Sequence, residues 1–261
     1  MNMAFQSTPP TQAEDGAWIL TQMAHLNLAM GNLDKSKTLP RQALVMFPGY
    51  HYALGNLAKV RIQPKRYPEA VELLKQRYQA AQHAENLYDL AAALQLAGRT
   101  GEAQETFAEF ERKSLLETAR ADNSNHELIF YYADHANDPA KAPEVAKREI
   151  ARRRDVYSLD SYAWALYRNA QYSEARKQIE TALAVGIRDA KFFRHAGEIE
   201  LKAGDRPAAE RHLCEAVQLN TLGSEQARAT LATLSPVLCS DRDWAWGASP
   251  QGTGWMMEAK S

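Results

Sequence analysis

The chain has 261 residues, of which 45% are hydrophobic and 24% are charged, and its formal net charge is −1. This composition is typical of a folded protein rather than a disordered one, and the near-zero charge gives no overall attraction to nucleic acid or to anionic membranes. No apolar run approaches the roughly 20 residues that are needed to cross a bilayer. We therefore expect no membrane span and no nucleic-acid partner.

The N-terminal segment, residues 1–16, has neither the basic start nor the apolar stretch of a signal peptide, and we expect it to be flexible. The cytoplasm is the default location on this basis, although the sequence leaves the compartment open. The two cysteines, Cys214 and Cys239, exclude a disulfide framework, and we expect both to be reduced thiols.

From residue 17 onward the sequence repeats itself. Six hexapeptides begin with a residue suited to a turn, or with a replacement for one, and end on a small residue: GNLDKS (31–36), KRYPEA (65–70), GRTGEA (98–103), NDPAKA (137–142), AQYSEA (170–175) and GDRPAA (204–209). The final small residues follow one another at intervals of 34, 33, 39, 33 and 34. A period of this length predicts a solenoid of stacked helical units.

Each hexapeptide lies between two segments that carry helix-packing positions. Twelve residues before the final small residue stand Ala24, Ala58, Ala91, Phe130, Ala163 and Gly197, and four residues after it stand Pro40, Leu74, Phe107, Ala146, Ile179 and Leu213. A small residue on each of two helices lets their backbones approach closely, while a large apolar residue fills the space beside them. We therefore predict two closely packed helices in each repeat.

This spacing resembles the tetratricopeptide repeat, whose pattern runs W-x2-L-G-x2-Y…A-x3-F…P. The clearest copies are residues 17–48 and 157–187. The resemblance implies an all-α fold, a right-handed α-solenoid of antiparallel helix pairs, with six repeats over residues 17–223. The approximate repeats are 17–50, 51–83, 84–122, 123–155, 156–189 and 190–223. Phe130 at a small position and Pro40 inside a helix depart from the pattern, and the proline should kink or shorten its helix.

Three further segments follow from the same pattern. An unbroken helical pattern from Gly101 to about Ala121 predicts that the second helix of repeat 3 is longer than its fellows, with Asp122 or Asn123 capping the next helix. Residues 224–238 should form a capping helix over the last repeat, with Ser224 as its N-cap. Residues 239–261 form a glycine-containing tail that holds three of the five tryptophans. The tail packs on the last helices, docks in a groove or leads into a further segment.

In tetratricopeptide arrays the first helices of the repeats line a concave groove that receives extended peptides, and the resemblance carries the groove-facing positions onto this chain. These positions are Trp18, Thr21, His25, Leu28; Tyr52, Gly55, Lys59, Ile62; Glu85, Tyr88, Ala92, Gln95; Glu127, Tyr131, Asp134, His135; Tyr157, Asp160, Trp164, Tyr167, Arg168; and Lys191, Arg194, Glu198, Lys202. The candidate peptide-binding residues among them are Tyr52, Lys59, Tyr88, Glu127, Tyr131, Asp134, His135, Asp160, Trp164, Tyr167, Arg168, Arg194 and Glu198.

The aromatic members of this set form a ladder along the groove: Tyr52, Tyr88, Tyr131, Trp164 and Tyr167. Aromatic side chains with a polar group dominate recognition surfaces, and charged neighbours fix the orientation of the partner. The alternative for each aromatic residue is that it packs between helices.

The stretch HELIFYYADH (126–135) is rich in residues that could bind a metal, yet it matches no catalytic spacing. Phe130 stands where a zinc protease would need its second histidine, and His126 and His135 are nine residues apart, on opposite faces of a helix. The chain has no glycine-rich phosphate loop and no G-x-S-x-G motif. The lysine–asparagine–arginine clamp by which one family subtype binds chaperone C-termini is not matched. We therefore predict no enzyme activity, no cofactor and no metal site.

The leading hypothesis is a non-enzymatic scaffold that binds an extended peptide segment of a protein partner in the concave groove. The alternative is a structural or assembly subunit that associates through its convex face, the long helix of repeat 3 or the C-terminal tail. A metal-assisted enzyme on a helical-repeat frame is less favoured. The sequence leaves self-association open and does not identify the partner.

Overall fold

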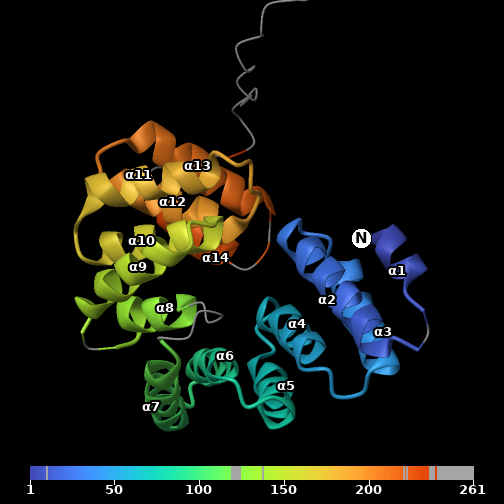
Figure 1. Cartoon of the computed structure of the whole chain (residues 1–261). Helices are drawn as coiled ribbons and strands as arrows, with labels where there is room; N and C mark the ends of the chain where they lie inside the picture. The colour runs from blue at the N-terminus through green and yellow to red at the C-terminus, as the bar shows by residue number, and fades with distance from the viewer. Residues whose placement is uncertain are drawn as a thin grey trace, which may run out of the picture.

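The computed structural model describes residues 1–9, 11–118, 125–136, 138–219, 221, 223–234 and 239. This part of the chain folds into fourteen helices and no strand (Figure 1). The helices are α1 (Asn2–Ser7), α2 (Ala13–Ala29), α3 (Leu33–Met46), α4 (His51–Ile62), α5 (Tyr67–Ala80), α6 (Ala84–Leu96), α7 (Thr100–Glu117), α8 (His126–Asp134), α9 (Lys141–Arg152), α10 (Val156–Arg168), α11 (Tyr172–Leu183), α12 (Ala190–Lys202), α13 (Arg206–Leu219) and α14 (Ser224–Leu234). The predicted all-α class is confirmed.

The helices from α2 to α13 pack as six consecutive pairs, which makes the chain an α-solenoid as predicted. Small residues are buried where the two helices of a pair meet: Ala24, Ala58, Ala91, Ala163, Ser36, Ala70, Ala103, Ala142, Ala175 and Ala209. In the last pair the approach is closest at Gly197, where an added Cβ would lie 2.5 Å from Cγ of Leu213. The sequence period therefore marks the points of helix contact.

In five of the six pairs the turn explains the first residue of the repeated hexapeptide, and in the fourth pair that residue, Asn137, lies outside the described residues. Gly31, Gly98 and Gly204 end their helices with φ angles of 78°, 74° and 88°, in the left-handed region. Lys65 and Ala170 occupy the same place in their repeats with φ angles of 60° and 58°. Glycine adopts this conformation freely, whereas a side chain there costs roughly 1–2 kcal/mol. The repeat thus requires a left-handed residue in this turn, and Lys65 and Ala170 meet this requirement at a cost in stability.

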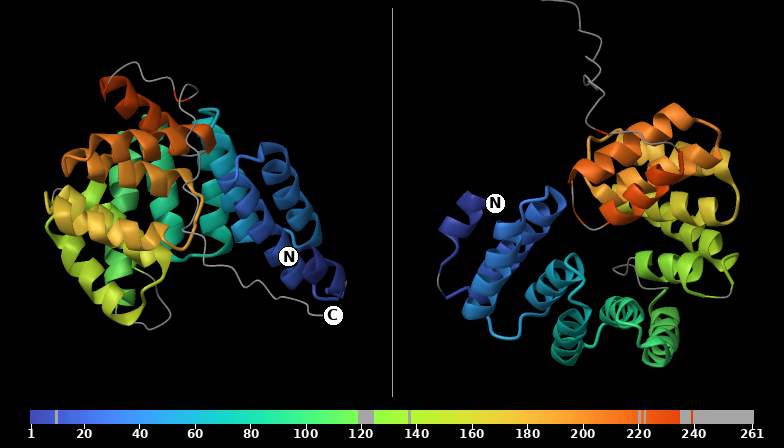
Figure 2. Two further views of the ribbon diagram at one scale, coloured as in Figure 1. Left: turned by 90° about the horizontal axis from the view of Figure 1, so that it is seen from above. Right: turned by 180° about the vertical axis from the view of Figure 1, so that it is seen from behind.

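The six pairs curve round so that the first repeat meets the end of the sixth (Figures 1 and 2). The turn after α2 approaches the end of α13 so closely that a Cβ on Gly31 would lie 2.6 Å from the carbonyl oxygen of Leu219. The turn after α4 is tied to α14, since Lys65 Nζ lies 2.7 Å from Glu225 Oε1. The solenoid therefore closes into a ring rather than leaving an open groove.

The N-terminal segment contains α1, whose Phe5 packs against the cluster that includes Leu20 and Tyr50. Its flexibility remains a prediction. In α3 the predicted effect of Pro40 on length is wrong, because the helix continues through the proline to Met46 and has 14 residues.

The region around α7 and α8 follows the prediction in part. With 18 residues, α7 is longer than the second helix of every other pair, as predicted. The predicted caps Asp122 and Asn123 lie outside the described residues, and Asn125 occupies the N-cap of α8. Its side chain does not cap the helix but donates to Glu149 Oε2 at 3.0 Å, so it ties α8 to α9.

At the C-terminal end, α14 packs on α12 and α13 as the predicted capping helix, with residues 235–238 outside the described part. Ser224 does not act as its N-cap, because its hydroxyl accepts from the Thr221 N–H and donates to the Ala216 carbonyl. The expected reduced thiols are also corrected: Cys214 and Cys239 form a disulfide, with Cα atoms 5.4 Å apart. Spacing alone gave no sign of this pairing, since it depends on how the chain returns to α13.

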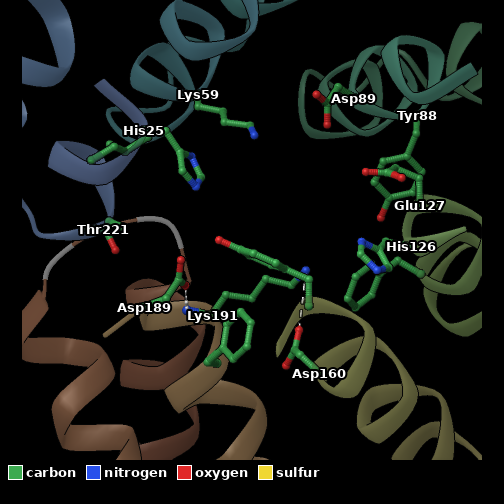
Figure 3. Close-up of a pocket in the computed structure, with 15 residues that line it drawn as sticks. His25, Lys59, Tyr88, Asp89, His126, Glu127, Asp160, Asp189, Lys191 and Thr221 are labelled. Carbon is green, nitrogen blue, oxygen red and sulfur yellow. Dashed lines mark hydrogen bonds and ion pairs between the residues drawn. The ribbon is translucent and has the colours of Figure 1, made fainter. Parts of the chain in front are cut away.

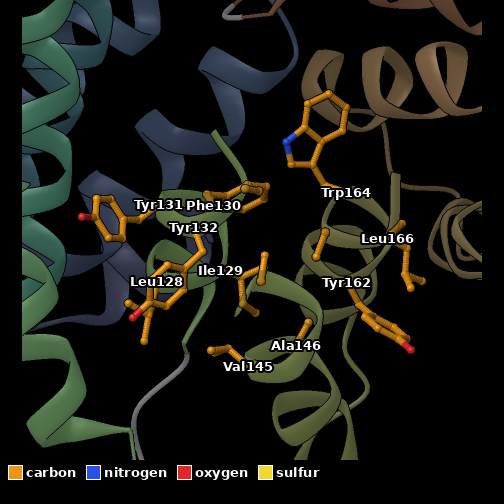
Figure 4. Close-up of a cluster of buried hydrophobic side chains, with 14 of the residues drawn as sticks. Leu128, Ile129, Phe130, Tyr131, Tyr132, Val145, Ala146, Tyr162, Trp164 and Leu166 are labelled. Atoms are coloured by element: carbon orange, nitrogen blue, oxygen red, sulfur yellow. The ribbon is translucent and has the colours of Figure 1, made fainter. Parts of the chain in front are cut away.

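The largest cluster of buried apolar side chains runs from α6 to α12 (Figure 4). It includes six consecutive residues of α8, from Leu128 to Ala133, together with Trp164 of α10. These residues lie on several sides of α8, which is the pattern of a helix buried between neighbours rather than one on an exposed face. This cluster holds the middle repeats rigidly around the centre of the ring.

Candidate functional site

A central cavity of about 410 Å³ lies on the inner side of the ring (Figure 3). Every first helix of the six pairs contributes to its wall, and so does the segment after α13. The lining residues are His25, Leu28 and Ala29 of α2; Lys59 of α4; Tyr88 and Asp89 of α6; His126, Glu127 and Phe130 of α8; Tyr157 and Asp160 of α10; Asp189, Lys191 and Phe192 at the start of α12; and Thr221. The cavity therefore exists only because the ring closes.

The start of α12 is fixed by its own cap, which aims a lysine into the cavity. The Asp189 carboxylate accepts the Lys191 N–H at 2.8 Å and so caps the helix. The Lys191 ammonium lies 3.5 Å from the centre of the Phe130 ring and 4.0 Å from Asp160 Oδ2. Burial by the surrounding protein lowers the pKa of this lysine, although 43% of its side chain is open to the cavity. The cavity is thus enclosed by protein while its interior remains accessible.

Asp160 is held on the opposite side by a buried histidine. His195 is 1% exposed, its Nδ1 lies 2.6 Å from Asp160 Oδ1, and its ring stacks on Trp164 with 4.1 Å between the ring centres. Burial lowers the pKa of His195 to about 4, so the ring is neutral near pH 7. A neutral imidazole that donates from Nδ1 orients the carboxylate and leaves its charge toward the cavity.

Three charged side chains of the wall have no ion-pair partner among the described residues: Lys59 on α4, Glu127 on α8 and Asp189, whose carboxylate instead caps α12. The pKa of Glu127 is raised to about 7, first by burial and then by the charges of Glu85 and Asp89 on α6. The neighbouring acid Asp89 is already paired with Arg77. Figure 3 shows Lys59 and Glu127 approaching from different helices with open space between them.

A smaller recess of about 230 Å³ adjoins the cavity and shares His25 and Lys59 with it. Its wall also contains Tyr52, Asn56 and Arg77. The Arg77 side chain is 8% exposed, and its Nε has no hydrogen-bond partner within the described structure. Gly55 allows this arrangement, because a Cβ there would lie only 3.1 Å from that Nε. The Arg77 guanidinium is thus enclosed against α4 and paired with Glu85 and Asp89.

The predicted groove residues separate into two groups. Lys59, Tyr88, Glu127 and Asp160 line the central cavity, and Tyr52 lines the recess. Most of the remaining residues make contacts between helices: Tyr131, Asp134, His135, Trp164, Tyr167, Arg168 and Arg194. Glu198 pairs with Arg194 on its own helix, α12.

The second group shows why the aromatic ladder does not continue along the cavity. Tyr131 is 9% exposed and donates to Glu111 Oε2 at 3.2 Å, and Trp164 is 3% exposed and donates to Asp134 Oδ2 at 2.9 Å. In both residues the ring fills the space between helices and the polar atom is already bonded. Neither side chain faces the cavity, so the packing alternative accounts for their positions.

Several cavity residues were not among the predicted groove positions: Ala29, Asp89, His126, Phe130, Asp189, Phe192 and Thr221. His126 bonds to Ser158 Oγ at 3.1 Å, and burial lowers its pKa. His126 directly precedes the groove position Glu127, and Asp89 directly follows the groove position Tyr88. A prediction that included the sequence neighbours of each groove position would therefore have found both residues. Thr221 gives no such signal, because only ring closure brings it to the wall.

Comparison with known proteins shows which solved structures have a similar fold. No family model and no curated protein matches the chain. Among solved structures, a tetratricopeptide repeat protein from Parabacteroides merdae is similar, with 14% identity, 83% of each chain covered and a TM-score of 0.53. The human IFIT1 dimer with m7Gppp-AAAA is similar at 14% identity over 84% of this chain and 52% of that one, with a TM-score of 0.57. The Cut9–Hcn1 hetero-tetramer of APC/C is similar at 13% identity over 86% and 46%, with a TM-score of 0.54.

The helix pairs, their period and these likenesses define the class: the chain has the α-solenoid fold of tetratricopeptide repeat proteins. Within the described ranges, no helix has both the length and the apolar character to cross a membrane. The same residues contain no group of three or more histidine, cysteine, aspartate or glutamate side chains arranged to hold a metal ion.

Proposed function

We propose that the chain is a non-enzymatic scaffold that binds a short extended segment of a partner protein, with side chains of that segment entering the central cavity. The observation that carries this proposal is the convergence of all six first helices on one cavity that contains unpaired charges. Its volume of about 410 Å³ lies within the range of roughly 300–1,000 Å³ that is typical of ligand sites. The enclosure favours a few side chains over a folded domain.

The cavity wall has the mixed character of a recognition site. Phe192 and the aromatic part of Tyr157 supply apolar surface, while Lys59 and Glu127 supply charges that a partner can neutralise. Apolar walls with a small number of placed polar groups are typical of sites that bind specifically. Ser158, whose hydroxyl bonds to His126 of the wall, is fully buried and does not line the cavity, which favours binding over catalysis.

The test is to fill the cavity. Ala29 lines it, so Ala29→Trp should occupy the space, whereas Ala108→Trp adds the same ring on an exposed part of α7. Random nonapeptides displayed on phage are selected on the unaltered protein, and the affinities of the enriched peptides are measured by fluorescence polarisation. We expect Ala29→Trp to weaken binding at least tenfold and Ala108→Trp to leave it unchanged. If no enriched peptide responds to Ala29→Trp while the variant remains folded, the proposal fails.

Two other expectations remain predictions. Self-association would be seen as a mass above that of one chain in light scattering. The expected absence of nucleic-acid binding requires a direct measurement, because the similar human structure contains m7Gppp-AAAA. A fluorescent single-stranded oligonucleotide should show no polarisation change at micromolar protein, and saturable binding would overturn that expectation.

A further inference from the structure

We propose that the central cavity selects a dipolar segment, one whose acidic side chain is received by Lys59 and the adjoining recess and whose basic side chain is received by Glu127. This inference rests on the proposed function and names the chemistry of the partner segment. It follows from the pairing of charges around the cavity wall.

The other charges of the wall are already matched. Asp89 is paired with Arg77, and Asp160 lies between Lys191 and the buried His195. The remaining acid, at the start of α12, caps that helix. His25 and His126 are neutral near pH 7, since burial lowers the pKa of each. Lys59 and Glu127 are thus the two charges of the wall that still lack a partner in the described structure.

The two unpaired groups are separated by a helix and do not form an ion pair. Lys59 projects from α4 and Glu127 from α8, and α6 lies between these helices in the ring (Figures 1 and 3). An enclosed charge without a partner is destabilising, so a ligand that neutralises both gains more than one that neutralises either alone. A ligand with a single charge leaves the second group unmatched.

The surroundings of Lys59 suit a carboxylate. The recess beside it is lined by Tyr52 and by Arg77, whose guanidinium is already paired with Glu85 and Asp89, so the donors open to a carboxylate are the Lys59 ammonium and the Tyr52 hydroxyl. Charged donors in a recess bind carboxylates with short, strong hydrogen bonds.

The surroundings of Glu127 suit a cation. Burial, together with the negative charges of Glu85 and Asp89 on α6, raises the pKa of Glu127 to about 7, and the charge of Lys191 offsets this only in part. The ring of Tyr88 lines the same part of the wall. An ammonium or guanidinium placed there would meet a carboxylate and an aromatic face together.

The test compares four proteins in the same selection of random nonapeptides: the unaltered chain, Lys59→Met, Glu127→Gln and the exchange Lys59→Glu with Glu127→Lys. We expect peptides from the unaltered chain to share an acidic and a basic residue at a constant separation. Lys59→Met should lose the preference for the acidic residue and Glu127→Gln that for the basic one. The exchange should reverse their order.

The matched control is the exchange Lys35→Glu with Glu105→Lys, two exposed residues on the outer helices α3 and α7. It has the same net change and should select the same peptides as the unaltered chain. If the selected peptides lose binding to the Ala29→Trp variant but carry no pair of opposite charges, this inference is overturned and the proposed function remains intact. Peptides that the cavity exchange does not alter would also overturn it.

A pH series adds an independent readout. Since a basic side chain binds the ionised form of Glu127, affinity should fall as Glu127 takes up a proton below its pKa of about 7. The ionised fraction then changes about tenfold between pH 8 and pH 6, so a selected peptide should bind about tenfold more weakly at pH 6. Glu127→Gln should flatten the profile. A tenfold change that persists in Glu127→Gln would contradict the assignment.

Discussion

Replacing Glu127 with glutamine should stabilise the free protein, and the gain should depend on pH. The pKa of Glu127 is raised from 4.5 to about 7, so between these values the unfolded chain releases a proton that the folded chain retains. The folded state then binds more protons, and its stability falls as pH rises through this window. The glutamine amide cannot ionise, so Glu127→Gln removes the free-energy cost of holding an ionised carboxylate in the folded protein.

The size of the effect follows from the shift. One pKa unit corresponds to about 1.4 kcal/mol, so the full shift sets an upper limit of about 3 kcal/mol at pH 8. Because the carboxyl opens to a cavity that admits water, we expect about 2 kcal/mol. At pH 4.5 the same comparison gives less than about 0.5 kcal/mol, since the folded state is then almost fully protonated and the unfolded state is already half protonated.

The assay is urea unfolding followed by circular dichroism at pH 4.5, 6, 7 and 8, for the unaltered chain and for Glu127→Gln. The measured quantity is the difference in free energy of unfolding between the two proteins at each pH. Glu105→Gln, on the exposed side of α7, is the control and should give a difference that does not vary with pH. A Glu127→Gln difference that is constant, or that shrinks as pH rises, would refute the reasoning.

Three further predictions concern stability and covalent structure. Ala170→Gly should raise the free energy of unfolding by about 1 kcal/mol, because it relieves the left-handed turn with φ 58°, and a loss on urea unfolding would argue against that strain. Gly197→Ala should lower it by about 1–3 kcal/mol, since the new Cβ would lie 2.5 Å from Leu213 Cγ, and an unchanged urea midpoint would disprove the close contact. Thiol titration of the denatured protein should find no free thiol before reduction and two after it, whereas two beforehand would show that Cys214 and Cys239 are not joined.

The fold could be predicted from the sequence because each repeat is specified by local requirements of backbone conformation and helix packing. A turn residue that accepts a left-handed conformation, a small residue at the helix contact and a large one beside it recur with nearly constant spacing. Even the exceptions Lys65 and Ala170 keep the left-handed turn of Gly31. Local backbone and packing demands of this kind can be read from a single chain.

The site was predicted less completely because it depends on how the repeats close. The groove positions placed Lys59 and Glu127 on the inner side, and both lie there. They could not show that Trp164 would be buried against His195, since that contact joins neighbouring repeats. Nor could they show that Thr221 would face α2, because small rotations between repeats add up over the whole ring.

The central claim is that a partner segment enters the cavity, and photo-crosslinking tests it most directly. The photoreactive residue p-benzoylphenylalanine replaces Tyr157, which lines the cavity, or Val45, which is exposed on the outer helix α3. Each protein is irradiated with a peptide from the selection, and the crosslinked product is measured by mass spectrometry. The account predicts a crosslink from position 157 that excess unlabelled peptide abolishes, and none from position 45. A crosslink from position 45 alone would contradict it.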